Sequence, residues 1–164
     1  MKKLYLIRHA KSSWKYPSMD DFDRPLNNRG KRDAPNMGQR LKEQSVVPDL
    51  LLSSPANRAF TTAEIIAAEV GYPLEDIETN EDIYLAGVGT LLEIIKNIED
   101  TNNITFLFGH NPGITELANT LAGIRIDNVP TCGIVCIEFD IKFWREVEEG
   151  QGTYISFEYP KQII

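Results

Sequence analysis

The chain has 164 residues, of which 42% are apolar, and its formal net charge at pH 7 is −7. This length and composition predict one domain, residues 1–164, with a hydrophobic core of its own. The negative charge argues against a broad surface for nucleic acid or for an anionic membrane. No apolar run approaches the ~20 residues that cross a bilayer, and the N-terminal residues lack the apolar core of a signal peptide. We therefore expect a cytoplasmic protein.

Strand-like and helix-like segments alternate along the chain. Short apolar runs predict strands at residues 3–7, 49–52, 77–79, 104–108, 134–139 and 153–158. Helical spacing of apolar residues predicts helices at 29–43, 53–70, 89–98 and 111–121. The second helix is expected to begin at Ser53-Ser54-Pro55, with a serine cap and an early proline. Repeated β-α units predict an α/β fold, a three-layer α/β/α sandwich with a mostly parallel central sheet and an antiparallel edge.

The chain has two histidines, and each follows a predicted strand of the parallel region. His9 comes after the strand at 3–7, and His110 comes after the strand at 104–108. In such sheets, ligands bind at the carboxyl ends of the strands, where the loops converge. Histidine also ionises close to neutral pH, so it can act as a nucleophile or carry a proton. The two positions therefore predict one shared site.

Two arginines accompany these histidines. Arg8 precedes His9, and Arg58 lies early in the predicted second helix, where the backbone amides favour anions. A guanidinium offers a fork of donors to a phosphate. Each of these residues alone also has a purely structural explanation. Arg8 and His9 could be a solvated pair in a loop, Arg58 an exposed helix arginine, and His110 a loop histidine with hydrogen bonds to its neighbours. All four at strand ends predict a phosphate site formed by Arg8, His9, Arg58 and His110.

A set of short motifs, in this order and spacing, resembles the histidine phosphatase superfamily. The motifs are Arg8-His9-Ala10-Lys11-Ser12, Arg24-Pro25-Leu26, Arg29-Gly30, Ser53-Ser54-Pro55 with Arg58 and Thr62-Ala63, and Gly109-His110-Asn111-Pro112. Within that superfamily, the short length and the first motif most resemble the SixA-like branch, which is named for a protein phosphohistidine phosphatase. The resemblance implies a phosphoglycerate mutase-like fold over nearly the whole chain.

The resemblance also implies a mechanism. His9 would attack phosphorus and become transiently phosphorylated, while Arg8, Arg58 and His110 hold the phosphoryl oxygens. Water would then hydrolyse the phosphohistidine, and no metal or cofactor is required. The implied partner is a phosphorylated protein or a small phosphorylated substrate. The residues leave the oligomeric state open, and a monomer is compatible with them.

The general acid of the superfamily has no clear counterpart in this chain. Asn111 follows His110, where acid-phosphatase members carry an aspartate. Glu81 and Asp82 fall near the acid position of mutase-like members, but they equally fit solvated loop carboxylates. Asp20, Asp21 and Asp23 lie in the loop after the first motif and could approach the pocket, but an acidic surface loop is the favoured interpretation. Ser12 and Asn111 are possible phosphate contacts.

The lack of an assigned acid bears on the substrate. An alkyl phosphoester benefits from protonation of its leaving group by about a hundredfold or more. Phosphohistidine releases imidazole, which is a better leaving group that can be protonated before cleavage. The sequence therefore favours a phosphohistidine phosphatase over two alternatives, a small-molecule phosphomonoesterase on the same scaffold and a noncatalytic phosphate-binding module.

Overall fold

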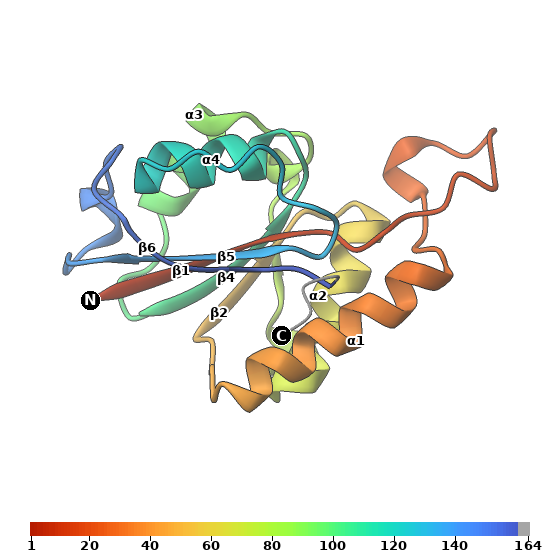
Figure 1. Cartoon of the computed structure of the whole chain (residues 1–164), viewed down its shortest axis with the longest axis horizontal. Coiled ribbons are helices and arrows are strands. Elements are labelled where there is room, and N and C mark those ends of the chain that lie inside the picture. Colours follow the sequence, from red (N-terminus) through yellow and green to blue (C-terminus); the bar gives the residue numbers. More distant parts are fainter. Residues whose placement is uncertain (161–164) are drawn as a thin grey trace.

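In the computed structural model, which describes residues 1–160, six strands form one mixed sheet (Figure 1). The strands are β1 (Lys2–Arg8), β2 (Leu50–Ser53), β3 (Glu78–Thr79), β4 (Ile104–Gly109), β5 (Ile134–Phe139) and β6 (Thr153–Glu158). Their order across the sheet is β3-β2-β4-β1-β5-β6. The first four strands in this order are parallel, and β5 and β6 add an antiparallel edge.

Helices cover both faces of this sheet (Figure 1). They are α1 (Asn28–Glu43), α2 (Asn57–Val70), α3 (Val88–Lys96) and α4 (Gly113–Ala122), with short 3-10 helices η1 (Asp21–Asp23), η2 (Leu74–Asp76), η3 (Glu81–Ile83) and η4 (Trp144–Glu146). Side chains alternate between the two faces of a strand, so Tyr5 and Ile7 pack with α1 and α2. Leu4 and Leu6 pack with α3 and α4. The predicted three-layer α/β/α sandwich is confirmed.

None of these helices, within residues 1–160, combines the length and the apolar character needed to cross a membrane.

The start of α2 differs from the sequence prediction. The helix begins at Asn57, and Ser53 is instead the last residue of β2. The hydroxyl of Ser54 accepts a hydrogen bond from the backbone N–H of Ala56 at 3.2 Å, ahead of the first helical residue. Ser54 and the two residues after it therefore form the turn between strand and helix, and no side chain caps α2.

The long connection from β1 to α1 is held against the start of α1. Ser12 forms an isolated antiparallel bridge with Leu26, and the N–H of Asn27 donates to the carbonyl of Lys11 at 3.0 Å. The side chain of Asn27 then caps α1 by accepting from the N–H of Gly30 at 2.9 Å. A side chain at position 30 would overlap the backbone carbonyl of Lys11. The missing side chain of Gly30 therefore lets the segment after β1 lie directly on α1.

This contact predicts an asymmetry between two glycines in helices. Gly30→Ala is expected to lower the free energy of unfolding by about 1–3 kcal/mol, because it forces the Lys11 backbone away from α1. Gly89→Ala in α3 is the matched control, since nothing lies near the added methyl group and alanine favours a helix by up to ~1 kcal/mol. Urea denaturation measures both. Equal stability of the two variants would contradict the close approach.

Candidate active site

The site lies at the carboxyl ends of three neighbouring strands. Arg8 pairs with Gly109 in the parallel register of β1 and β4, and the N–H of His9 donates to the carbonyl of Gly109 at 3.1 Å. On the other side of β4, the N–H of Ser54 donates to the carbonyl of Phe108 at 3.0 Å. The rings of His9 and His110 are consequently neighbours, with centroids 5.2 Å apart. The two histidines share one site, as their positions after strands predict.

A cavity of about 230 Å³ opens at this edge of the sheet. It is lined by Arg8, His9, Lys11, Ser12, Trp14, Asp21, Arg24, Arg58, Leu85, His110, Asn111 and Thr131. The structure thus brings together the six residues Arg8, His9, Ser12, Arg58, His110 and Asn111 that sequence reasoning named. Four of the lining side chains are cations and, within residues 1–160, one is a carboxylate. No group of three or more histidine, cysteine, aspartate or glutamate side chains that could hold a metal ion occurs in this same part of the chain.

The hydrogen bonds of His9 determine which ring nitrogen carries its proton. Nδ1 lies 2.7 Å from the carbonyl oxygen of Ala10, which can only accept, so Nδ1 carries the hydrogen. The other nitrogen, Nε2, keeps its lone pair and accepts a hydrogen bond from Nε of Arg58 at 3.3 Å. The segment after β1 is held in place by α2, because the N–H of Ala10 donates to the hydroxyl of Thr62 at 2.9 Å. Nε2 of His9 therefore presents a lone pair in a fixed orientation.

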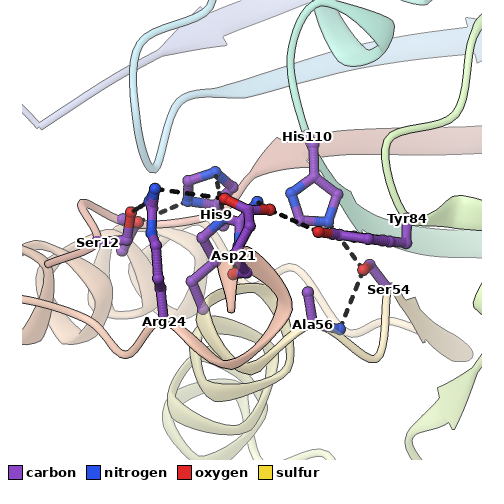
Figure 2. Close-up of polar contacts among 10 residues, drawn as sticks. His9, Ser12, Asp21, Arg24, Ser54, Ala56, Tyr84 and His110 are labelled. Carbon is purple, nitrogen blue, oxygen red and sulfur yellow. Dashed lines mark hydrogen bonds and ion pairs between the residues drawn. The ribbon is translucent and has the colours of Figure 1, made fainter. Parts of the chain in front are cut away.

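Ser54 has a corresponding effect on His110. Its hydroxyl oxygen accepts from the N–H of Ala56 and lies 2.8 Å from Nε2 of His110 (Figure 2). We assign the hydroxyl hydrogen of Ser54 to Nε2, and in this tautomer Nδ1 carries the ring proton. Nδ1 of His110 is buried and has no hydrogen-bond partner among the described residues. In this tautomer it is a donor that suits a phosphoryl oxygen.

Arg58 links His9 to the only carboxylate that lines the cavity within residues 1–160. Its side chain is buried, and Nη2 and Nη1 donate to the Oδ2 and to the backbone carbonyl of Asp21 at 2.9 and 2.6 Å. The hydroxyl of Tyr84 donates to the same Oδ2 at 2.5 Å. The hydrogen bond from Tyr84 lowers the pKa of Asp21 despite partial burial, and Arg58 adds to this shift. Asp21 is therefore ionised at neutral pH.

Of the three aspartates at 20–23 that could approach the pocket, Asp21 lines the cavity, although its side chain remains 43% exposed. Asp21 belongs to the 3-10 helix η1, and its neighbours Asp20 and Asp23 do not line the cavity. One signal for this position was present in the sequence. Asp21 lies three residues before Arg24, and Nη1 of Arg24 forms a 3.4 Å ion pair with its Oδ1.

Arg24 is a cavity residue to which sequence reasoning gave no role beyond its motif. Its side chain is buried, Nη2 donates to the hydroxyl of Ser12, and Nε has no partner among the described residues. The ring of Trp14 lies over the guanidinium, 3.5 Å from its central carbon to the ring centroid. Trp14 is itself 73% exposed. Arg24 therefore adds a third guanidinium to the wall of the cavity, beneath an aromatic rim.

Glu81 and Asp82 do not line this cavity, which corrects their assignment as candidate acids. Asp82 lines a separate cavity beside β2 and α3, and Glu81 lines neither. The reason is the short helix η3, in which Asn80 accepts from the N–H of Asp82 and Ile83 is buried in the core. This arrangement directs Tyr84, and not a carboxylate, to the site.

Asn111 lines the cavity, but its side chain is engaged elsewhere. Its oxygen accepts from the N–H and the hydroxyl of Thr115 at 3.2 and 2.9 Å. Its nitrogen donates to Asn128 at 3.0 Å and to the carbonyl of Val129 at 2.9 Å. Asn111 thus ties the start of α4 to the loop before β5.

Both histidines are neutral at physiological pH. Burial lowers the pKa of His9 to about 3; the hydrogen bond to Ala10 opposes this shift, and the neighbouring ring of His110 and the charges of Arg58 and Arg8 add to it. Burial also lowers the pKa of His110 to about 4, with a further contribution from Arg58. A neutral imidazole has the free lone pair that nucleophilic attack needs.

Comparisons with known proteins agree with this geometry. A family model described as the histidine phosphatase superfamily (branch 1) matches residues 4–84. An uncharacterised Mycobacterium tuberculosis protein is 32% identical over 166 residues, covering 94% of this chain and 100% of that protein. A candidate SixA phosphohistidine phosphatase from Agrobacterium tumefaciens superimposes with a TM-score of 0.83 and 27% identity, over 97% of this chain and 98% of that one. A tungstate complex of the protein histidine phosphatase SixA shares the fold, with a TM-score of 0.83 and 22% identity over 96% and 97% of the two chains.

The fold and the site define an α/β protein with a cationic cavity beside two neutral histidines. The chain belongs to the histidine phosphatase superfamily, and it is a phosphatase. The family resemblance of the sequence motifs is confirmed.

The lowered pKa values predict a loss of stability in acid. Below pH 6.5 the histidines of the unfolded chain bind protons, whereas His9 and His110 in the folded chain stay neutral until pH falls to about 3 and 4. The free energy of unfolding should therefore fall between pH 7 and pH 5, by roughly 1–2 kcal/mol for each histidine. Urea denaturation at the two pH values measures this change. The chain has no other histidine, so the His9→Asn, His110→Asn double variant should lose this part of the pH dependence, and an unchanged dependence would contradict burial of neutral rings.

The contact of Ser54 predicts that its hydroxyl positions His110. Ser54→Ala is expected to lower kcat/KM by about tenfold, the scale of one lost hydrogen bond. The same substitution should also lower the fraction of His110 rings that carry their proton on Nδ1, which ¹⁵N NMR of the imidazole measures. Ser53→Ala is the matched control, because that hydroxyl donates to the carbonyl of Ser54 and does not touch His110. Equal effects of the two substitutions would show that Ser54 has no special role.

Proposed function

We propose that this phosphatase hydrolyses phosphohistidine on proteins through a phosphorylated His9. The observation that carries the proposal is the state of Asp21, the single carboxylate that lines the cavity within residues 1–160. It is ionised and accepts hydrogen bonds from Tyr84 and Arg58, so it is not a carboxylic acid that could protonate a leaving group. Such a site suits a leaving group that needs no strong acid, and the ring of a protonated phosphohistidine is one, because it leaves as neutral imidazole.

In the first step, the lone pair on Nε2 of His9 forms a bond to phosphorus as the bond from phosphorus to the leaving nitrogen breaks. The electron pair of that bond stays on the leaving imidazole. Charge on the phosphoryl oxygens is stabilised by Arg8, Arg58 and Nδ1–H of His110. The incoming phosphoryl group would take over the donor that Arg58 directs at Nε2. Arg8 has a further donor ready, because its buried Nε has no partner among the described residues.

In the second step, water attacks the phosphorus of phospho-His9. The new bond joins the water oxygen to phosphorus, the electron pair of the broken bond returns to Nε2, and inorganic phosphate leaves with the water oxygen. The hydrogen bond from Nδ1 to the carbonyl of Ala10 holds the ring in one orientation through both steps. His9 is thereby regenerated as a neutral nucleophile.

The shape of the cavity supports a substrate carried on a protein. Its volume of about 230 Å³ has room for a phosphoryl group and a small ring, and Trp14 and Leu85 at its mouth are 73% and 58% exposed. Such an exposed rim suits a side chain that protrudes from a protein surface. The 27% identical Agrobacterium protein is described as a candidate phosphohistidine phosphatase, which supports the same substrate class.

A substrate panel tests this proposal. The protein should cleave a phosphohistidine peptide and p-nitrophenyl phosphate with higher kcat/KM than phosphoserine or a sugar phosphate. The last two compounds are alkyl esters, and their cleavage would go without the general acid that speeds departure of an alkoxide by about a hundredfold or more. The reverse order would instead assign the protein to small-molecule phosphomonoesterases. Phosphate binding without turnover of any of these compounds would indicate a noncatalytic module.

Substitutions of His9 and of Arg58 should have different effects on catalysis and binding. His9→Ala is expected to abolish turnover, because no other group takes the phosphoryl group. Arg58→Ala should mainly weaken the binding of phosphate and of the transition state. Steady-state kinetics and calorimetric phosphate binding separate the two effects, and circular dichroism checks the fold of each variant. Near-normal turnover by folded His9→Ala would exclude covalent catalysis through His9.

A further inference from the structure

The carboxylate of Asp21 has acceptor capacity that its neighbours leave unused. A carboxylate offers about four lone-pair positions on its two oxygens. Oδ2 accepts from Tyr84 and Arg58 at 2.5 and 2.9 Å. Within residues 1–160, Oδ1 has only Nη1 of Arg24, at 3.4 Å, which is longer than a normal charge-assisted hydrogen bond. One more donor can therefore reach Oδ1 without displacing Tyr84 or Arg58.

Asp21 also lies at the mouth of the cavity and not on its floor. Its side chain is 43% exposed, whereas that of Arg58 is 5% exposed. Figure 2 shows Asp21 between Arg24 and Tyr84 and in front of His9. In phosphohistidine, the phosphoryl group is on one ring nitrogen and the second nitrogen is across the ring. With the phosphoryl group beside His9, the N–H of that second nitrogen points away from phosphorus and toward the mouth.

The charge of Asp21 is as distinctive as its position. The other charged side chains that line the cavity are the cations Arg8, Lys11, Arg24 and Arg58. A protonated phosphohistidine ring carries positive charge, and this set of cations disfavours it. Among the described residues of the cavity, Asp21 alone supplies the opposite charge.

We propose that Asp21 selects the substrate, with its Oδ1 accepting a hydrogen bond from the second ring N–H of protonated phosphohistidine. This inference rests on the proposed function and names the residue that recognises the leaving group. When the bond between phosphorus and nitrogen breaks, its electron pair stays on that nitrogen while the other nitrogen keeps its proton. The product is a neutral imidazole, and Asp21 neither gains nor loses a proton. Asp21 thus stabilises the form of the substrate that is easiest to cleave.

The backbone around Asp21 holds the carboxylate in position before any substrate arrives. Its carbonyl accepts from Nη1 of Arg58 at 2.6 Å, and the carbonyl of Asp23 accepts from Asn57 at 3.1 Å, so α2 anchors η1 at two points. Phe22 packs edge-on against Tyr84, with ring centroids 5.2 Å apart. An acceptor that is already ordered costs little entropy when it binds.

The test compares two substrates that differ in the leaving group. A phosphohistidine peptide releases a ring with an N–H, whereas p-nitrophenyl phosphate releases a phenolate without one. Asp21→Asn should lower kcat/KM for the peptide at least about tenfold more than for p-nitrophenyl phosphate, since the acceptor that faces the charged ring N–H loses its negative charge. Asp23→Asn is the matched control, because it removes the same charge from the same short helix at an exposed side chain. It should leave the ratio of the two kcat/KM values unchanged.

The possible outcomes separate this inference from the proposed function. If Asp21→Asn lowers both values equally, Asp21 only positions Arg58, and the inference is overturned while cleavage of phosphohistidine by the unmodified protein upholds the proposed function. If the unmodified protein does not cleave the peptide, both fail together. Asp21→Ser supplies a second uncharged side chain in case the asparagine variant does not fold, and thermal unfolding checks each variant. A selective loss in either folded variant supports recognition of the ring by Asp21.

Discussion

β1 and β4 pair in parallel with Arg8 opposite Gly109, and this register determines where the groups of the site lie. A shift of one residue would turn the side chains of a strand to the opposite face of the sheet. With the observed register, His9 and His110 leave neighbouring strands at the same level, and their rings lie 5.2 Å apart. β2 pairs with the other side of β4, so Ser54 reaches His110 and the helix that follows brings Arg58 to His9. Three segments of sequence thus meet through strand pairing.

Burial then sets the chemistry of these groups. It keeps both imidazoles neutral, so His9 presents a lone pair and His110 presents an N–H without either ring carrying charge. It also places the guanidinium of Arg58 where its charge acts on a phosphoryl group through little water. The chain as a whole carries a net charge of −7, so the attraction for an anion is local to this cavity. Asp21 offsets part of the positive charge of the cavity and holds Arg58 in place through two hydrogen bonds.

Sequence reasoning predicted the sheet and the four central residues because strand periodicity and strand ends are local signals. It misplaced the features that depend on distant contacts. The hydroxyl of Ser54 is bound to His110, 56 residues away, so the helix starts later than a serine cap suggests. Asp21 lies in a segment without periodicity, and its role depends on Arg58 and Tyr84. Burial of Ile83 orients η3, and for that reason Tyr84 reaches the site while Asp82 does not.

The central claim is that a phosphoryl group binds between the two histidines and is transferred to His9. A crystal structure with tungstate, which mimics a phosphoryl group in transfer, tests this most directly. The account predicts tungsten bonded to Nε2 of His9, with its oxygens accepting hydrogen bonds from Arg8, Arg58 and Nδ1 of His110. Tungstate bound away from these four residues, or beside them with Nε2 of His9 turned away, would contradict it.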